Sequence, residues 1–288
     1  MISTSRIDKK DPMKASIRFV TACLILTFFC RPVLASDGLM TIHFVDVGYG
    51  DAIFIELPDG ENVLIDAGQS EHAGCLIKYL DARNIESLET VILTHPHEDH
   101  FGGLASLIEK RSVGTFYING DAERAQEGYD DLIRTIEGRR VSTTVLEEGD
   151  ELVLGGKEVR FLVLHPSALD GTANENALVF LIVFKEISIL LTSDIQAAQQ
   201  DELLRCYPQI QSANVIQVPH HGGIITDQFA EAFGNDPVFI VSTGANEYGK
   251  PLVEQLDKLK GKVYRTDLHG SVVLQSDGHQ IEVINERY

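Results

Sequence analysis

Cysteine is scarce in this chain, and the shortage excludes one class of fold. Only four of the 288 residues are cysteines, and two of them, Cys23 and Cys30, lie in an apolar segment near the start. The remaining pair, Cys75 and Cys206, allows one disulfide bond or two separate thiols, so a disulfide-stapled scaffold is excluded. No repeat or low-complexity tract is present. With 44% hydrophobic residues the chain can bury a substantial core, as one large domain or two small ones.

Basic residues are also few, and this bears on partners. The chain has 24 Lys and Arg against 43 Asp and Glu, a formal net charge of −19. Proteins that hold extended nucleic acid gain affinity by neutralising phosphates with Lys and Arg, and no basic run or basic–aromatic interleaving occurs here. We therefore expect a small or locally docked phosphate ester as the partner, rather than long duplex DNA.

The longest uncharged apolar run, Phe19–Cys30, is too short to span a bilayer comfortably and follows a basic leader. We expect residues 1–35 to be a secretory signal cleaved after Ala35, which leaves residues 36–288 as one folded domain. Removing six Lys/Arg and two Asp/Glu then shifts the net charge from −19 to −23. The protein would be exported by a bacterium, periplasmic or secreted, and not stably membrane-bound. An uncleaved N-terminal anchor is the alternative, because Arg31 interrupts the path to the cleavage site.

The chain is organised around the stretch THPHEDH at residues 94–100, which follows an apolar run and precedes a helical pattern. In a locally extended loop, His95 and His97 project to the same side and are able to share one ion. Asp99 and His100 are adjacent and diverge, so they are better placed to reach a second ion. Imidazole and carboxylate together suit zinc or a similar ion.

Glu98 is expected to point away from these ligands. A solvated polar loop is the alternative for a single histidine after a strand. Four ligand-type residues in H-x-H-x-D-H order favour a site for two metal ions instead.

The surrounding segments alternate between strand and helix patterns. Residues 40–48, 51–57 and 62–68 read as an antiparallel meander, and Ala73–Ala82 reads as a helix. Residues 142–166 read as a series of hairpin strands, and residues 177–195 as a strand pair covered on both faces. This alternation indicates the mixed α/β class. Asp194 ends the buried pair and needs a partner, for which a metal ion is the obvious candidate.

The motif and its flanks resemble a known family. THPHEDH followed by FGG is similar to the signature of the metallo-β-lactamase fold. Upstream IHFVDVGYGDAIFIELPDGENVLIDAG, and downstream NENALVFLI, ILLTSDI and VPHHGG, resemble the ComEC-type competence-protein branch of those hydrolases, here as a stand-alone domain. The resemblance runs from about Met40 to near the C-terminus. It implies a four-layer αββα sandwich of two mixed sheets with helices outside.

The resemblance also implies roles for particular residues. The aspartate matching Asp194 bridges the two ions, and one of His220 and His221 closes the second metal site. We favour His221 as the ligand and His220 as a neighbouring donor, with the reverse left open. Supporting positions are implied, rather than ligation, for Asp46, Asp51 and Asp66, although turn chemistry is an alternative for an Asp before Gly.

One departure from the family's pattern concerns the first metal site. Many of these enzymes have a histidine just before the strand that begins at Ala177, where this chain has Asn174-Glu175-Asn176. Asn176 is then a candidate lining ligand, and His165 a candidate substitute. Further along, Asn246, Tyr248 and Lys250 stand where the family places residues over the pocket, although a solvated loop explains Lys250 equally well.

Together these patterns predict a binuclear metal-dependent hydrolase, with Zn or alternatively Mn as the ions. The substrate class expected is a phosphodiester-type bond attacked by hydroxide, in nucleic acid or in a smaller phosphate ester. The alternatives are hydrolysis of a carboxylic ester, lactone or amide on the same fold, and a metal-free binding module. The predicted catalytic residues are Asp99, His220 and Lys250. The predicted metal ligands are His95, His97, Asp99, His100, Asp194 and His221, with His165 and Asn176 as further candidates.

Overall fold

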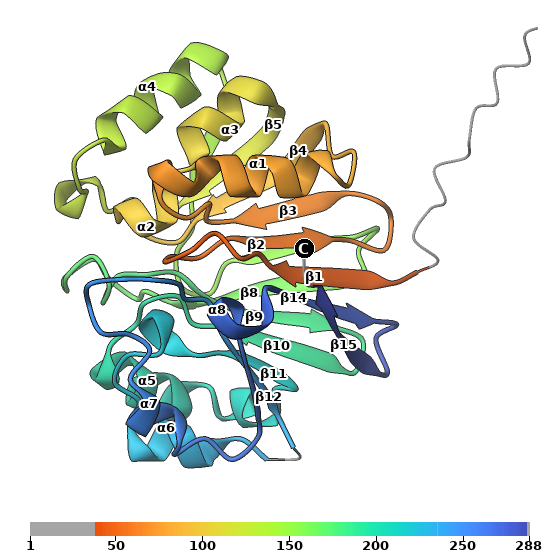
Figure 1. Cartoon of the computed structure of the whole chain (residues 1–288), viewed down its shortest axis with the longest axis vertical. Helices are drawn as coiled ribbons and strands as arrows, with labels where there is room; N and C mark the ends of the chain where they lie inside the picture. Colours follow the sequence, from red (N-terminus) through yellow and green to blue (C-terminus); the bar gives the residue numbers. More distant parts are fainter. Residues whose placement is uncertain (1–37, 235, 287–288) are drawn as a thin grey trace, which may run out of the picture. The chain divides into compact units, whose positions relative to one another are not determined.

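The computed structural model describes residues 38–234 and 236–286, and the expected leader lies outside these ranges (Figure 1). Strand β1 is the first element of these described ranges. Within the described part of the chain no helix combines the length and apolarity that a bilayer crossing requires.

The first sheet has eight strands in the order β15-β14-β1-β2-β3-β4-β5-β6. Its members are β1 (Met40–Phe44), β2 (Ile53–Glu56), β3 (Asn62–Ile65), β4 (Ser87–Leu93), β5 (Ser112–Ile118), β6 (Ser142–Val145), β14 (Ser271–Ser276) and β15 (Ile281–Glu286). Strands β1, β2 and β3 pair antiparallel, so the predicted meander is confirmed. From β3 to β6 the pairing is parallel.

The second sheet has seven strands in the order β13-β12-β11-β10-β9-β8-β7. Its members are β7 (Glu151–Leu154), β8 (Val159–His165), β9 (Val179–Phe184), β10 (Ile187–Leu191), β11 (Val215–Gln217), β12 (Val238–Val241) and β13 (Lys262–Arg265). Strands β7 to β10 are antiparallel, and β10 to β13 are parallel. Both sheets are therefore mixed, as expected.

Helices cover the outer face of each sheet (Figure 1). The helices of the described residues are α1 (Ala73–Asp81), α2 (Glu98–Phe101), α3 (Leu104–Lys110), α4 (Tyr129–Arg139), α5 (Ala197–Cys206), α6 (Asp227–Ala232), α7 (Val253–Leu256) and α8 (Thr266–His269), with the short turns η1 (Ser70–His72), η2 (Ala122–Arg124), η3 (Pro208–Ser212) and η4 (Pro219–His221). Helices α1, α3 and α4 pack on the first sheet, and α5, α6 and α7 on the second. The predicted αββα sandwich is confirmed.

Strand β9 shows why the sandwich holds together. Phe180 and Ile182 join the core between the two sheets, while Val179 and Leu181 join the core under α5 and α6. Successive side chains of a strand point to opposite faces, so a strand that is apolar throughout must be covered on both. Each such side chain contributes roughly 1.5–3 kcal/mol on burial.

One sequence-based assignment is wrong. Residues 142–166 were expected to form successive hairpins, but only β7 and β8 do so. Strand β6 pairs in parallel with β5 and belongs to the first sheet. The turn residues after β6 therefore carry the chain from one sheet to the other, a choice that local turn chemistry does not encode.

The two cysteines outside the leader do not form a disulfide bond. Cys75 on α1 and Cys206 at the end of α5 are both free and exposed. Cys75 and Cys206 are therefore two separate thiols.

Candidate metal centre

The loop after β4 is held by an aspartate from the neighbouring strand. Asp66 follows β3 and is fully buried, and its carboxylate accepts from the Thr94 amide at 2.8 Å and the Thr94 hydroxyl at 2.7 Å. Because β3 and β4 are parallel, their carboxyl ends lie at the same edge of the sheet. The contacts with Asp66 hold Thr94 at that edge, and the histidines of the loop follow directly after it.

The histidines of this loop lie together, as the spacing predicts. The ring centroids of His95 and His97 are 4.7 Å apart, and those of His95 and His100 are 4.1 Å apart. His97 has an extended backbone and directly precedes α2, which turns Asp99 and His100 away from it. A histidine from the other sheet completes the group, since the His221 ring is 5.3 Å from that of His100.

Asp194 stands at the centre of this cluster. It follows β10, and its Oδ1 lies 3.4 Å from Nε2 of His100 and 3.4 Å from Nε2 of His221. Its Oδ2 lies 4.0 Å from Nε2 of His95. The side chain is buried, so the partner predicted for this carboxylate must come from within the site.

The other ring nitrogen of each histidine is already engaged. Nδ1 of His100 donates to Asp66 at 2.7 Å, and Nδ1 of His221 donates to the Ser242 carbonyl at 3.0 Å. Such contacts set the tautomer and turn Nε2 toward a metal ion, which is the usual arrangement around ligating histidines. The predicted supporting role of Asp66 fits this contact.

The unpartnered polar atoms test whether the site suits a metal. Among the described residues, Nε2 of His95, His100 and His221 and Oδ1 of Asp194 are buried without a hydrogen-bond partner. Asp99 Oδ2 is 3.2 Å from Nε2 of His221, but outside hydrogen-bond geometry. Buried polar atoms left unpaired cost roughly 1–3 kcal/mol each, so this convergence indicates a ligand that the side chains themselves do not provide. The donor set fits a divalent cation of the zinc type.

The electrostatics point the same way. Burial opposes charge on Asp194, but the adjacent His221 and His100 hold its pKa well below the usual range. Burial also opposes charge on His221, yet Asp194, Asp99 and Asp51 raise its pKa to about 10. A buried group of carboxylates demands positive charge, which protons on the histidines or a metal ion supply equally well.

Asp51 lies close to the same group, but on its other side. Ligand atoms of Asp51, His100, Asp194 and His221 all lie within 4.8 Å of one another. The Asp51 carboxylate, however, is 3.9 Å from Nδ1 of His100 and 3.9 Å from Nδ1 of His221, which are the engaged nitrogens. It also accepts from Gln217 Nε2 at 2.7 Å. This position fits the supporting role expected of Asp51, with burial raising its pKa to about 6.

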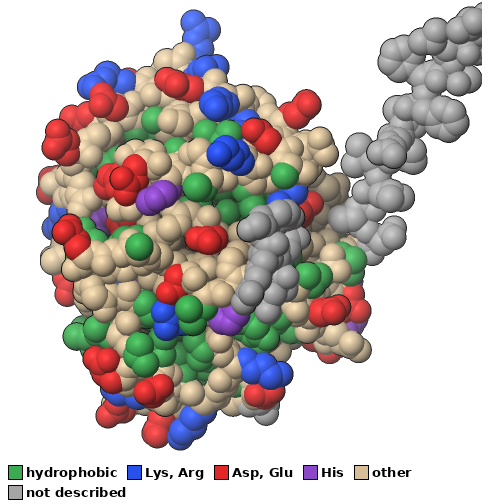
Figure 2. All heavy atoms as spheres, in the orientation of Figure 1, with side chains coloured by type: hydrophobic (Ala, Val, Ile, Leu, Met, Phe, Trp, Pro, Cys, Tyr) green, Lys and Arg blue, Asp and Glu red, His purple; other side chains and the backbone are tan. Residues whose placement is uncertain are grey.

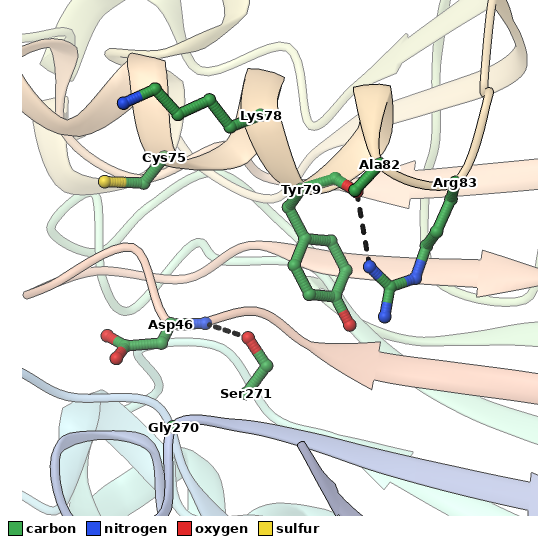
Figure 3. Close-up of a pocket in the computed structure, with 8 residues that line it drawn as sticks. All are labelled: Asp46, Cys75, Lys78, Tyr79, Ala82, Arg83, Gly270 and Ser271. Atoms are coloured by element: carbon green, nitrogen blue, oxygen red, sulfur yellow. Dashed lines mark hydrogen bonds between the residues drawn. The ribbon is translucent and has the colours of Figure 1, made fainter. Parts of the chain in front are cut away.

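Asp46 does not reach the site. It is exposed, its Oδ1 accepts from the Gly48 amide at 3.2 Å, and its own amide donates to Ser271. It lines a cavity of about 340 Å³ between α1 and the start of β14, whose lining includes Cys75 and Tyr79 but no member of the histidine cluster (Figure 3). The turn interpretation of Asp46 is therefore correct, and its assignment to the site is wrong.

Two further candidates for the first metal have other partners. His165 Nε2 lies 2.6 Å from the Glu175 carbonyl, so this nitrogen is engaged by the loop before β9. In the Asn176 side chain, Nδ2 donates to the Asp121 carboxylate at 2.6 Å, and Oδ1 accepts from the backbone amide of Gly171 at 3.1 Å. Both residues organise that loop through these contacts, and their assignment as ligands stays a prediction. The neighbouring asparagine, Asn174, is the one beside the site, with its Nδ2 3.2 Å from His220 Nε2.

Part of the chain that forms this site matches a known protein family. Residues 45–175 match the model of the metallo-β-lactamase superfamily. This part of the chain is therefore a metallo-β-lactamase domain. It is a superfamily hydrolase with a candidate metal site, and the predicted recognition is confirmed.

Two curated relatives support the ComEC-type resemblance. ComE operon protein 3 of Bacillus subtilis (strain 168) is 26% identical, over 92% of this chain and 37% of its own length. Recombination protein 2 of Haemophilus influenzae (strain ATCC 51907 / DSM 11121 / KW20 / Rd) is 26% identical, over 97% of this chain and 34% of its own length. This chain thus spans about a third of these relatives.

A solved structure shows the same fold. CmlA, a diiron β-hydroxylase from Streptomyces venezuelae, has a TM-score of 0.53 and 13% identity, covering 86% of this chain and 54% of its own. A hydroxylase on this fold illustrates that the fold does not determine the reaction. The chemistry of this superfamily member has to be argued from its own site.

His220 is held differently from His221. Gln196 Nε2 donates to Nδ1 of His220 at 2.9 Å and to the Asp194 carbonyl at 2.8 Å. On the other side of the ring, Nε2 of His220 lies 3.5 Å from Asp194 Oδ2 and 3.2 Å from Asn174 Nδ2. Burial lowers the pKa of His220 to about 4, so the ring is neutral at pH 7. Both ring nitrogens of His220 have a side-chain amide beside them, whereas Nε2 of His221 is unpartnered among the described residues, and this favours His221 as the ligand and His220 as its neighbour.

The backbone at this pair is unusual. His220 has φ 52° and His221 has φ 56°, in the left-handed region that costs other residues roughly 1–3 kcal/mol each. The turn after Pro219 sends the two rings in different directions, with centroids 6.1 Å apart. Neither the sequence spacing nor helix propensity indicates this geometry.

Lys250 approaches the site from the loop after β12. Its Nζ donates to the Tyr49 hydroxyl at 3.3 Å, and the Tyr49 ring is 4.6 Å from that of His221. Burial lowers the pKa of Lys250, against the opposing effect of Asp194 and Asp99. The loop position over the site agrees with the prediction. Tyr49, Gln196 and Gln217 were not predicted, because no motif marks a lone tyrosine or glutamine.

We expect Asp66→Ala to lower both stability and metal affinity. The change leaves the Thr94 amide, the Thr94 hydroxyl and His100 Nδ1 without their acceptor, and alanine disfavours the φ of 58° found here. The expected cost is about 3–5 kcal/mol of unfolding free energy and about 10–100-fold in zinc affinity. Urea denaturation and zinc titration measure the two. Asp66→Asn keeps one acceptor and tolerates this φ, so it should lose less; equal losses in both variants would contradict the orienting role.

Proposed function

We propose that this protein is a metal-dependent hydrolase of phosphodiester-type bonds that uses two divalent cations, Zn or Mn. One ion would be held by His95, His97 and Asp194, and the other by Asp99, His100, Asp194 and His221. The observation that carries the proposal is the convergence of unpartnered Nε2 atoms of three histidines on Asp194. A side-chain cluster retained for stability alone would pair these atoms with one another or with the backbone.

Divalent cations at such a site act as Lewis acids and lower the pKa of coordinated water to near 7. Their charge of +4 exceeds that of the two ligating carboxylates, Asp99 and Asp194, so the site attracts an anion in an otherwise acidic protein. Lys250 adds a further positive charge at the mouth of the site. Together these charges favour an anionic phosphodiester over a neutral ester or lactone.

The chain's own groups then divide the work. Asp99 and Asp194 balance the charge of the ions, while Asp66 and Ser242 fix the tautomers of His100 and His221. In the tautomer with its proton on Nε2, His220 would donate a hydrogen bond to a substrate oxygen or to a departing alkoxide. Lys250 lies close enough to the site to interact electrostatically with Asp194 and Asp99. Its positive charge would orient the anionic phosphate group of the substrate.

The balance of charge also bears on substrate size. The full chain carries −19, and on the face shown in Figure 2 basic side chains are interspersed with acidic ones. A basic track for a long duplex would neutralise many phosphates in a row. We therefore propose a small or single-site phosphate ester as substrate.

The test is turnover of bis-p-nitrophenyl phosphate by protein loaded with zinc or manganese, beside nitrocefin and a lactone. We expect release of p-nitrophenolate that EDTA abolishes and added metal restores, and elemental analysis should find close to two ions per chain. Turnover of the lactone or nitrocefin alone would instead support the carboxylic ester, lactone or amide alternative. A loaded preparation that keeps no ion would support the metal-free binding module.

We also propose that the basic leader directs export, with cleavage after Ala35. Its composition, a basic segment followed by the apolar run Phe19–Cys30, supports this. N-terminal sequencing of the protein recovered from a bacterial periplasm checks it. An intact Met1 would favour the membrane-anchored alternative.

A further inference from the structure

Tyr248 is a large aromatic side chain that faces solvent beside the candidate metal centre. It is 63% exposed, although most large apolar side chains of the described chain are buried. Its ring centroid is 5.2 Å from that of Tyr49, with an angle of 35° between the planes. Tyr49 in turn lies 4.6 Å from the His221 ring. The three rings form a continuous line from the proposed ligand His221 to solvent.

The loop that carries Tyr248 is held in place. Asn246 accepts from the amides of Tyr248 at 3.0 Å and Lys250 at 3.1 Å, and its amide group donates to the carbonyls of Gly244 at 2.8 Å and Lys250 at 2.7 Å. Gly244 packs so closely on Gly48 that a Cβ there would come within 2.4 Å of the Gly48 carbonyl carbon. The exposed ring therefore sits on a fixed support, which lowers the entropic cost of binding against it.

We propose that Tyr248, backed by Tyr49, is a stacking platform for a planar aromatic group of the substrate. This inference rests on the proposed phosphodiesterase function and narrows its substrate class. Lys250 places a cation beside Tyr49, the inner ring of the platform, because its Nζ donates to the Tyr49 hydroxyl at 3.3 Å. A substrate that fits both features is a phosphodiester with a flat ring, such as a nucleobase or an aryl group, next to the phosphate.

The platform makes no bond and breaks none, so its effect is on binding. Stacking of a base on an aromatic side chain is worth about 1–3 kcal/mol by alanine substitution, or roughly 5- to 150-fold in affinity. Tyr248 contacts Tyr49 through its ring and not through a hydrogen bond of its hydroxyl group. A phenylalanine should therefore replace it, whereas an alanine should not.

The experiment compares two esters with methanol as the common leaving group: thymidine 5′-(methyl phosphate), which carries a planar base, and cyclohexyl methyl phosphate, which has no aromatic ring. We expect Tyr248→Ala to raise KM for the thymidine ester about tenfold with little change in kcat. For the cyclohexyl ester, KM should change less than twofold, and Tyr248→Phe should resemble the parent on both. Leu268→Ala, which removes another exposed apolar side chain on α8, is the matched control and should leave both esters unaffected.

A second measurement keeps this inference separate from the proposed reaction. Calorimetric binding of phenylphosphonate and methylphosphonate to the metal-loaded protein requires no turnover. If neither ester is hydrolysed but Tyr248→Ala weakens phenylphosphonate selectively, the platform stands and the proposed reaction does not. Equal losses for aryl and alkyl ligands, or no loss for either, would overturn the platform while leaving hydrolysis intact.

Discussion

Asp194→Ala is expected to abolish hydrolysis and to release bound metal. Asp194 lies within 3.4 Å of Nε2 of both His100 and His221, and its other oxygen is 4.0 Å from Nε2 of His95. It is thus the carboxylate shared by both proposed ions, and its loss removes a ligand from each. Turnover of bis-p-nitrophenyl phosphate should fall about 1,000-fold or more, on the scale of other preorganised electrostatic groups. Elemental analysis should find less than one ion per chain.

The same variant offers a readout that does not depend on activity. In the parent, zinc should raise the midpoint of thermal unfolding, because an ion that binds only the folded chain stabilises it by mass action. In Asp194→Ala this rise should largely disappear. Asp201→Ala is a control, since Asp201 accepts from Thr226 at the start of α6 and takes no part in the site. An Asp194→Ala protein that keeps two ions and full turnover would contradict the two-metal assignment.

The second large effect is expected at Asp99, with its sequence neighbour as the control. The Asp99 carboxylate lies 3.2 Å from Nε2 of His221, whereas Glu98 Oε1 accepts from the amide and hydroxyl of Ser70, at 2.8 and 2.7 Å. Asp99→Ala should lower turnover about 100- to 1,000-fold and reduce metal content. Glu98→Ala should leave turnover within about twofold and cost about 1 kcal/mol of stability, from its lost hydrogen bonds.

These two adjacent acidic residues form a sharp test of the loop geometry. Both have the same charge, they differ by one methylene, and they are one position apart on α2. Steady-state kinetics and metal analysis on the two purified variants decide between them. If Glu98→Ala is as damaging as Asp99→Ala, the geometry that assigns only Asp99 to the site is wrong.

Much of the fold could be predicted from the sequence because its signals are local. Apolar runs bounded by glycine and aspartate indicate the strands β1, β2 and β3, and the spacing of Leu76, Ile77 and Leu80 indicates α1. The one wrong assignment concerned β6, which pairs with β5 in the other sheet. Strand pairing is a long-range choice, and no turn motif near β6 records it.

The site divides in a similar way. The motif at residues 94–100 predicts His95, His97, Asp99 and His100 as one group, because six neighbouring positions cannot separate far. His165 and Asn176 were assigned by position in the chain, and the structure gives their polar atoms to the loop before β9. Local spacing indicates the contacts within the motif, whereas the partners of His165 and Asn176 depend on how the loop before β9 folds.

From the sequence alone, the class of fold and the nature of the metal-binding loop follow, since side-chain periodicity and the close spacing of ligand types act over a few residues. Only the tertiary structure decides how Asp194 and His221 from the second sheet meet that loop, and which nitrogen of each histidine faces the centre. It also places Tyr49 and Tyr248 in line with His221. The physical reason is that these contacts join residues from different elements, 34 positions apart for Asp66 and His100 and farther for His100 and Asp194, and tertiary packing brings them together.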